Sequence, residues 1–236
     1  MKEIIITDLT RFKGRVNVCT AGIDLSTGQC IRPMPYLQEN DRARLNIHPG
    51  AIIRGDLTPK KNLTAPHIED HNYNQLNYLG PCSEEQFRQA LELSLKNGIS
   101  AGFNTYLPAG SKHIPTANAN DPDTSIITIK VEPRRFEIIE DQYKPGKIKA
   151  NFTDQTGSSY RYISITDLDF HDYAIEHHSR NDLDSLNKFI QSQQELFLRI
   201  GLSREHQVGE RNGYWLQVNG IYTFPNFLQH IRGFQS

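Results

Sequence analysis

The sequence has few of the residues that build disulfide frameworks or structural metal centres. Its 236 residues include three cysteines, Cys19, Cys30 and Cys82. An odd number without a Cys-x-x-Cys pair argues against a disulfide framework and against a structural zinc site. Cys19 and Cys30 have apolar neighbours, so we expect them to be small buried thiols. No metal and no cofactor is predicted from the sequence.

Long apolar runs are also missing. No stretch approaches the length that a membrane-spanning helix needs, so no membrane partner is expected. Met1 is followed by Lys2, Glu3 and then a strand-like run, a pattern that excludes a signal peptide at this position. The sequence therefore predicts a cytoplasmic protein.

An excess of positive charge, common in nucleic-acid-binding proteins, is absent from the whole chain, since the formal net charge is −1. Residues 11–61 nevertheless carry nine Lys or Arg against four Asp or Glu. This stretch is either an anion-binding face or ordinary solvated surface. The phosphate-binding glycine motifs Gly-x-Gly-x-x-Gly and Gly-x-x-x-x-Gly-Lys do not occur, nor does a nucleophilic cysteine motif.

Strands are expected where β-branched and aromatic residues lie between glycine and proline turns. The expected strands cover about residues 3–9, 16–25, 30–33, 51–57, 125–132, 135–140, 147–154, 159–168 and 214–223. Gly28 and Gly157 would take the positive φ of the two hairpin turns. Residues 58–81, rich in Pro, Asn and His, are predicted to form a long surface loop.

Two helices are expected. Ser83-Glu84-Glu85-Gln86 has the pattern of a capping box, and an apolar stripe follows it, which predicts a helix near 84–97. A second helix is predicted near 183–200, from Asp182 to a stop at Gly201. Its apolar face would consist of Leu186, Phe189, Ile190, Phe197 and Ile200.

The pattern predicts a mainly β fold with two or more helices (α+β), built as two OB-like β-barrels packed together. Residues 1–106 would form the first barrel, residues 107–124 a linker rich in Pro and Gly, and residues 125–236 the second barrel. Ile6-Thr7-Asp8-Leu9 recurs as Ile165-Thr166-Asp167-Leu168, a short echo consistent with duplication.

The two ends of the chain resemble a known family. At the start these are the segments 6–12 (Ile-Thr-Asp-Leu-Thr-Arg-Phe), 21–24 (Ala-Gly-Ile-Asp) and 31–33 (Ile-Arg-Pro). At the end they are 201–204 (Gly-Leu-Ser-Arg) and 214–222. Together they resemble the dual OB-containing domain family. The resemblance implies two OB-like barrels, but neither a reaction nor a site residue.

Three arginines are candidate ligand-binding residues, because each lies where a strand or helix is expected to end. Arg32 precedes Pro33 and could reach a phosphate, or it could pair with a carboxylate such as Asp24. Arg11 ends the first strand, and Arg204 follows the second helix. Each has the same two interpretations.

Tyr214 and Trp215, on the last strand, are the aromatic candidates for ligand binding. Bases of single-stranded nucleic acid stack on such rings, at about 1–3 kcal/mol each. The alternative is that these rings belong to the core or its rim.

His67, Glu69 and Asp70 form the most concentrated polar cluster, next to His71. Imidazole and carboxylates together could bind a divalent metal or act in acid–base catalysis. The alternative is a polar loop with internal hydrogen bonds. The spacing differs from the His-Glu-x-x-His pattern of catalytic zinc helices.

The sequence favours a binding module for single-stranded nucleic acid or a nucleotide over an enzyme. One alternative is a metal-dependent enzyme that acts on such ligands through His67, Glu69 and Asp70. A second alternative is a protein-interaction scaffold. The two halves are expected to pack as one unit, with Arg32 and Arg204 at a common cleft.

Overall fold

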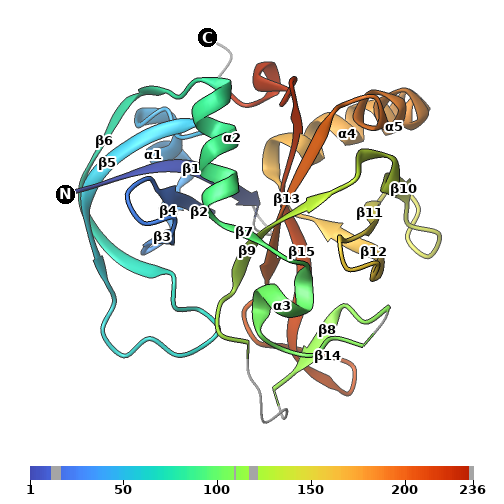
Figure 1. Ribbon diagram of the computed structural model, residues 1–236, viewed down its shortest axis with the longest axis horizontal. Helices are drawn as coiled ribbons and strands as arrows, with labels where there is room; N and C mark the ends of the chain where they lie inside the picture. The colour runs from blue at the N-terminus through green and yellow to red at the C-terminus, as the bar shows by residue number, and fades with distance from the viewer. Residues whose placement is uncertain (12–16, 109, 117–121, 234–236) are drawn as a thin grey trace.

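Two β-barrels, one from each half of the chain, lie side by side in the computed structural model (Figure 1). The structure describes residues 1–11, 17–108, 110–116 and 122–233. None of the helices in these ranges is long and apolar enough to cross a membrane. The predicted mainly β fold with two OB-like barrels is confirmed.

The first barrel contains five strands that close on themselves. They are β1 (Lys2–Arg11), β2 (Asn17–Asp24), β3 (Cys30–Met34), β5 (Ala51–Pro59) and β6 (Asp70–Pro81). Their order around the barrel is β1-β2-β3-β6-β5, and β5 pairs again with β1. The short strand β4 (Leu37–Gln38) and helix α1 (Glu39–Arg44) lie between β3 and β5. Ile4, Ile6, Ile31 and Ile53 fill the interior.

The second barrel is built from six strands. Its strands are β9 (Ile126–Val131), β10 (Phe136–Glu140), β11 (Ile148–Thr153), β12 (Ser159–Ile165), β13 (Glu195–Leu202) and β15 (Arg211–Phe224). The sheet runs β10-β11-β12-β15-β13-β9, and the 3-10 turn η1 (Pro133–Arg135) joins β9 to β10. With β9 and β10 counted as one strand that η1 interrupts, the order matches that of the first barrel. In each barrel the third strand is then parallel to the last one, as β3 is to β6 and β12 is to β15.

Helix α2 (Glu84–Leu93) lies between the barrels (Figure 1). The capping box is present, because Ser83 Oγ accepts a hydrogen bond from the Gln86 amide and the Gln86 side chain accepts one from the Ser83 amide. Phe87 and Leu91 are buried in an apolar cluster with residues of both barrels. The cluster contains Ile5 and Ile23 of the first barrel and Phe197, Tyr222, Phe224 and Phe227 of the second half.

The segment after α2 packs on the second barrel. Strand β7 (Leu95–Lys96) pairs with β9, and helix α3 (Ile99–Phe103) contributes Ile99 and Phe103 to the second core. Strand β8 (His113–Pro115), within the predicted linker 107–124, pairs with β15. Strand β14 (His206–Val208) also pairs with β15, and η2 (Gln229–Ile231) lies close to the end of the chain.

The predicted helix near 183–200 is wrong in its second half. Two helices precede β13, namely α4 (Leu168–Ser179), which the sequence did not suggest, and α5 (Leu183–Gln191). Phe197 and Ile200 belong to strand β13, which starts at Glu195. Nearly all of β13 is buried on both faces, so its continuous apolar run shows no strand alternation and resembles a buried helix.

The predicted surface loop 58–81 is correct for residues 60–69, which connect β5 to β6, and wrong for residues 70–81, which form β6. Most side chains of β6 are at least partly exposed and many are Asn or Gln, so the apolar signal of a strand is weak. The strand-like segments of the first 57 residues, the 147–168 hairpin and the last strand are confirmed. The repeated tetrapeptide lies in β1 and across the β12–α4 junction, so it does not mark equivalent positions.

Candidate functional site

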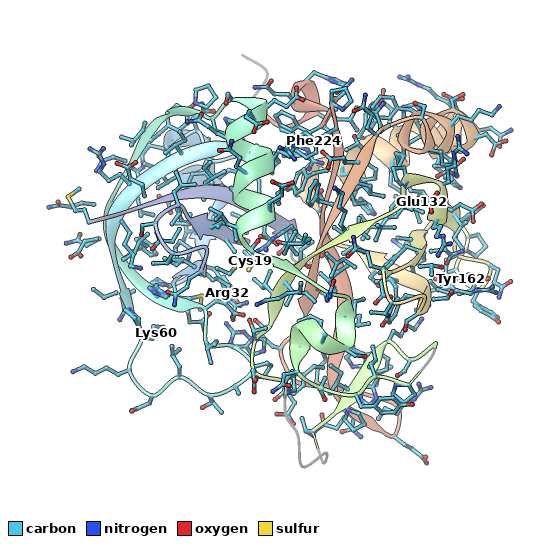
Figure 2. The ribbon with its side chains drawn as sticks, in the orientation of Figure 1. Cys19, Arg32, Lys60, Glu132, Tyr162 and Phe224 are labelled. Atoms are coloured by element: carbon cyan, nitrogen blue, oxygen red, sulfur yellow. The ribbon has the colours of Figure 1, made fainter. Side chains whose placement is uncertain are left out.

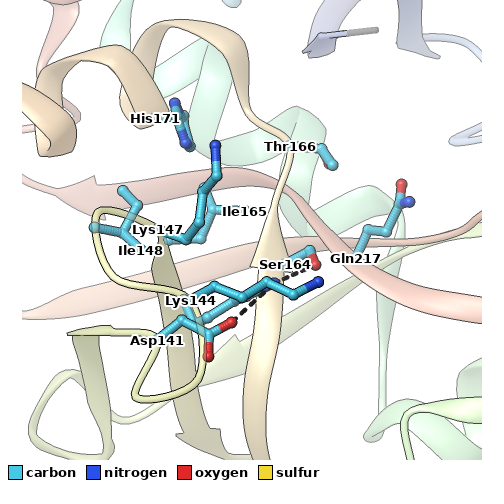
Figure 3. A pocket seen from close by; sticks show the side chains of 10 residues that line it. Asp141, Lys144, Lys147, Ile148, Ser164, Ile165, Thr166, His171 and Gln217 are labelled. Carbon is cyan, nitrogen blue, oxygen red and sulfur yellow. Dashed lines mark hydrogen bonds and ion pairs between the residues drawn. The ribbon is translucent and has the colours of Figure 1, made fainter. Parts of the chain in front are cut away.

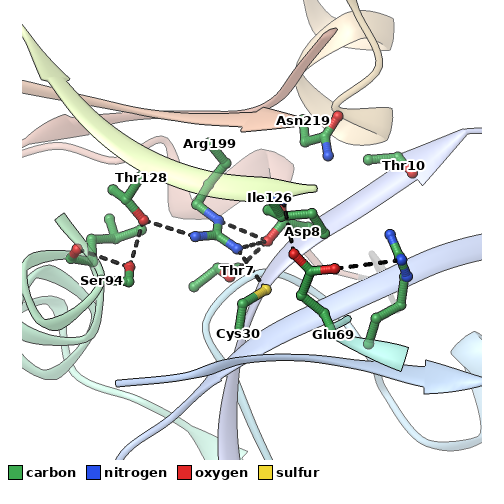
Figure 4. Close-up of polar contacts among 12 residues, drawn as sticks. Thr7, Asp8, Thr10, Cys30, Glu69, Ser94, Ile126, Thr128, Arg199 and Asn219 are labelled. Carbon is green, nitrogen blue, oxygen red and sulfur yellow. Dashed lines mark hydrogen bonds and ion pairs between the residues drawn. The ribbon is translucent and has the colours of Figure 1, made fainter. Parts of the chain in front are cut away.

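The second barrel covers the outer face of β1 and β3 of the first. Arg199 on β13 is fully buried there, and its Nε donates a hydrogen bond to Asp8 Oδ2 at 2.8 Å (Figure 4). The two Nη atoms reach Thr128 Oγ1 at 2.8 Å and Cys30 Sγ at 3.1 Å. One guanidinium therefore joins β1 and β3 of the first barrel to β9 and β13 of the second.

Arg32 is the second buried cation of this interface, with 4% of its surface exposed. Its Nε donates to Asp70 Oδ1 at 2.6 Å, and its Nη1 donates to Ser125 Oγ of the second half at 3.3 Å. Its Nη2 lies 3.3 Å from His67 Nδ1 and 3.7 Å from Glu69 Oε2. Most of its N–H groups therefore already face partners within the protein.

Arg204 reaches the same carboxylate from the second barrel. Its Nη2 donates to Asp70 Oδ2 at 2.9 Å, and its Nε donates to the Tyr36 hydroxyl at 3.2 Å. Although burial alone would raise the pKa of Asp70, the guanidinium groups of Arg32 and Arg204 hold it below its ordinary value. The structure thus brings Arg32 and Arg204 together across the interface, with Asp70 between them.

Asp24, the carboxylate that the sequence offered as a partner of Arg32, instead accepts a hydrogen bond from Lys2 Nζ at 2.7 Å. Glu69 is held by the second barrel. Its Oε1 accepts the amide N–H of Ser125 at 2.6 Å, and its Oε2 accepts the hydroxyl of the same residue at 2.8 Å. The two carboxylates next to Arg32, those of Glu69 and Asp70, therefore both have hydrogen-bond partners in the second half of the chain.

His67, Glu69 and Asp70 converge on Arg32. Burial, together with the charges of Arg204 and Arg32, lowers the pKa of His67 to about 3, so the imidazole is neutral. Within the described ranges no group of three His, Cys, Asp or Glu residues could hold a metal ion. The hydrogen bonds of Arg32, Glu69 and Asp70 connect the two barrels. Catalysis by His67, Glu69 and Asp70 stays a prediction.

Tyr214 and Trp215 lie on β15, near the same interface. Tyr214 is buried, with its ring centroid 6.0 Å from that of His67 in an edge contact. The ring centroid of Trp215 lies 4.6 Å from that of His113, and the guanidinium of Arg211 lies 5.9 Å from the Trp215 centroid. Both aromatic candidates thus pack against neighbouring side chains. The side chain of Arg11 lies outside the described part of the chain.

A cleft of about 700 Å³ opens between the barrels. Its lining mixes charges and apolar groups, including Lys96, Asp123, His71 and Leu93. Cys30 also lines it, but burial raises the pKa of this thiol to about 12, so it is protonated and a poor nucleophile. The cleft therefore shows neither a concentration of one charge nor an activated nucleophile.

The outer side of the β11–β12 hairpin is open to solvent, unlike the face of the first barrel that the second barrel covers. On β11 the side chains of Lys149, Asn151 and Thr153 alternate with buried residues and point away from the core. On β12 the side chains of Arg161, Tyr162 and Ser164 are exposed or partly exposed. We call these six residues, together with the loop 141–147, the hairpin face.

Two tyrosines lie on the hairpin face. Tyr143 in the loop is 79% exposed, and its ring centroid is 6.4 Å from that of Tyr162. Tyr162 has a left-handed backbone (φ +57°), and its amide donates to Asn151 Oδ1 at 2.9 Å, which fixes this irregular turn of the strand. Tyr162 lies at the outer edge of the second barrel, away from Cys19 and Arg32 (Figure 2).

A hollow lies at each end of the hairpin face. The lysine hollow, of about 430 Å³, is lined by Lys144, Lys147, Lys149, Asp141, Ile148, Ser164, Ile165, Thr166, His171 and Gln217 (Figure 3). The arginine hollow, of about 540 Å³, is lined by Arg134, Arg135, Arg161, Phe136, Glu137, Asn151, Phe152, Thr153, Ser159, Tyr160 and Gln191. Cations therefore flank the same hairpin at both ends.

Sequence reasoning missed the hairpin face, since it sought positive charge in residues 11–61. The missing signal was local. Lys149, Asn151 and Thr153 alternate with apolar residues on a strand that was predicted, and Lys144-Pro-Gly-Lys147 precedes it. Nearby acidic residues such as Glu140 and Asp141 conceal this cluster in any count of net charge.

Comparisons with known proteins agree with the two-barrel architecture. The model of the family described as dual OB-containing domain matches residues 2–221. Searches of curated proteins and of solved structures found no match. The match spans both barrels and the interface between them, and the fold supports an OB-type binding module. The chain therefore belongs to the dual OB-containing domain family.

Proposed function

We propose that this protein binds single-stranded nucleic acid or a nucleotide through the hairpin face of its second barrel. The observation that carries the proposal is the combination of exposed Tyr143 and partly exposed Tyr162 with lysines and arginines on one open surface. In OB-folds the second and third strands and the adjoining loops are the usual ligand surface, and β11 and β12 hold these two positions here.

The arrangement of the barrels supports this choice. In the first barrel the corresponding surface includes Cys30 and Arg32 on β3, and residues of the second half contact both side chains. In the second barrel β9, β13 and β15 form that contact, so β11 and β12 remain uncovered. Among the described residues, the second barrel is therefore the one whose hairpin is open to a ligand of the size of an oligonucleotide.

The chemistry of the face suits a single strand. Bases stack on aromatic rings regardless of their identity, while lysine and arginine contact the phosphates. Arg134, Arg135 and Arg161 line the arginine hollow and are exposed, and Arg135 also pairs with the exposed Glu132 at 3.2 Å. Guanidinium groups fit backbone phosphates well. Binding of this kind carries little sequence preference and weakens as salt is added.

The test is fluorescence anisotropy with labelled single strands of about 12 nucleotides, a length within the range of one or two OB barrels. Tyr143→Ala with Arg161→Ala removes one stacking ring and one phosphate contact. We expect the affinity to fall about 10- to 100-fold, and the slope of log K against log salt to decrease by about 0.7.

The matched control is Tyr106→Ala with Lys61→Ala, which removes an exposed tyrosine and an exposed cation from outside the hairpin face. Its affinity should stay within about twofold of the wild-type value. Equal losses in the two double variants would show that the hairpin face is not the binding surface. If Arg204→Ala lost affinity and the hairpin-face variant did not, the ligand would bind at the interface between the barrels instead.

A further inference from the structure

The lysine hollow is bounded on two opposite sides by different elements. Figure 3 shows Asp141 and Lys144 of the β10–β11 loop on one side and His171 of α4 on the other. Ser164 and Thr166 also line it, and the Thr166 hydroxyl donates to Val218 and Asn219 of β15. His171 is only 6% exposed, so α4 forms a wall of the hollow. The hollow opens toward the hairpin face through Lys149 and Ser164, which belong to both.

The loop that carries the lysines is built by its own hydrogen bonds. The Asp141 carboxylate accepts the Tyr143 amide at 3.0 Å, and the Asp141 carbonyl accepts the Lys144 amide at 3.0 Å. The Lys147 amide donates to the Lys144 carbonyl at 3.1 Å, and Glu140 accepts the Gly146 amide at 2.7 Å. These bonds fix the backbone beneath Lys144 and Lys147, so both side chains start from defined positions.

The third lysine is positioned by its neighbours on the hairpin. Lys149 Nζ donates to Ser164 Oγ at 2.9 Å and lies 3.9 Å from Asp141 Oδ2. Three ammonium groups and one carboxylate leave the hollow with a formal charge of +2. A phosphate monoester carries about −1.5 to −2 at pH 7, whereas a phosphodiester within a strand carries one negative charge.

We infer that the lysine hollow binds a phosphate monoester, supplied by the phosphorylated end of a strand or by a nucleoside monophosphate. This inference rests on the proposed function and specifies its ligand. The formal charge of +2 matches a dianion better than it matches the single charge of an internal phosphodiester, and three lysines supply ammonium donors to one hollow. The hairpin face then receives the nucleotides that follow the bound end.

The experiment compares three internally labelled strands of one sequence, with a 5′-phosphate, a 3′-phosphate or no terminal phosphate. We expect one phosphorylated strand to bind the wild-type protein about tenfold more tightly than the unphosphorylated strand, because additional charge-assisted hydrogen bonds form. Lys144→Ala with Lys147→Ala should remove this preference. Arg134→Ala with Arg135→Ala is the matched control, which should weaken all three strands alike and keep the preference.

Equal affinity of the wild-type protein for all three strands would overturn the inference and leave the proposed function intact. A preference that survives the double lysine change would also overturn it, because the monoester would then bind elsewhere. Binding of adenosine monophosphate that requires the two lysines, without binding of any strand, would support the hollow and identify a nucleotide as its ligand. Absence of binding to strands and to the nucleotide would overturn both the inference and the proposed function.

Discussion

At the scale of single residues, the polar cluster near His67 serves the junction of the barrels. The cluster has the composition of a catalytic site, yet each carboxylate faces an arginine or a backbone amide. His67 is 9% exposed, and its Nδ1 lies next to the Arg32 guanidinium. Burial disfavours a positive charge on this imidazole, and the charges of Arg204 and Arg32 beside it add to the effect, which explains the lowered pKa.

The lowered pKa of His67 predicts a loss of stability in acid. The folded protein keeps this imidazole neutral down to about pH 3, whereas the unfolded chain binds a proton near pH 6.5. The unfolded state therefore gains protons first as the pH falls, and the free energy of unfolding decreases below about pH 6.5. Between pH 7 and pH 5, wild-type protein should lose about 2 kcal/mol more than His67→Gln.

Urea denaturation at the two pH values measures this difference. Comparison with the variant cancels the contributions of other groups, such as Asp169, whose pKa burial raises to about 6 and whose effect has the opposite sign. Parallel pH profiles of the wild type and the variant would contradict the prediction.

At the scale of elements, local signals determined which predictions were correct. The capping box placed the start of α2 correctly, because Ser83 and Gln86 act within one turn of chain. Gly28 takes φ +71° in the turn between β2 and β3, and glycine in such a turn is visible in sequence. The hairpin at 147–168 was also predicted correctly, because one face of each strand is exposed and the other is buried, which gives the sequence its alternation.

Elements defined by tertiary contacts could not be predicted in this way. Strand β13 is buried on one side by its own barrel and on the other by the first barrel, so no alternation remains. The partners of Arg32 are 35 to 93 residues away in sequence, and nothing local indicates them. Likewise, the sequence does not indicate which strands of one barrel the other barrel covers, so it could not predict that the hairpin face is exposed.

The N-terminus of α2 offers a test at this scale. Ser83→Ala removes the side-chain acceptor for the Gln86 amide, so the free energy of unfolding should fall by about 1 kcal/mol. Gln89→Ala changes an exposed residue of the same helix that lies outside the box, and it should cost less than about 0.5 kcal/mol. Chemical denaturation provides both values. Equal effects of the two changes would mean that the capping box contributes nothing.

At the scale of the molecule, buried ion pairs join the two barrels alongside an apolar cluster. Asp8 and Arg199 belong to different barrels, and both are at most 1% exposed. Such a pair contributes little net stability compared with an apolar contact, but losing one partner leaves a buried charge uncompensated. The relative position of the barrels therefore depends on keeping both charges.

A double-mutant cycle tests this dependence. Arg199→Met should lower the free energy of unfolding by about 3–5 kcal/mol, because Asp8 remains buried without its cation. Adding Asp8→Ala should cost less than it does in the wild-type background, with a coupling energy of about 1–3 kcal/mol. The control Lys2→Met breaks the more exposed pair with Asp24 and should cost about 1 kcal/mol or less. If Arg199→Met lowered the free energy of unfolding no more than Lys2→Met does, the Asp8–Arg199 pair would not hold the barrels in position.

The position of β15 has a consequence for biosynthesis. The first barrel has all its strands once residue 81 has left the ribosome, whereas β15 is translated about 130 residues later. At about 5–20 residues per second this delay lasts roughly 6 to 26 seconds. During it, Asp8 lacks its partner Arg199, and the apolar cluster around α2 lacks Phe197, Tyr222, Phe224 and Phe227. We expect a chain that stops short of β13 and β15 to aggregate more readily than the full chain, because part of this apolar surface then stays exposed.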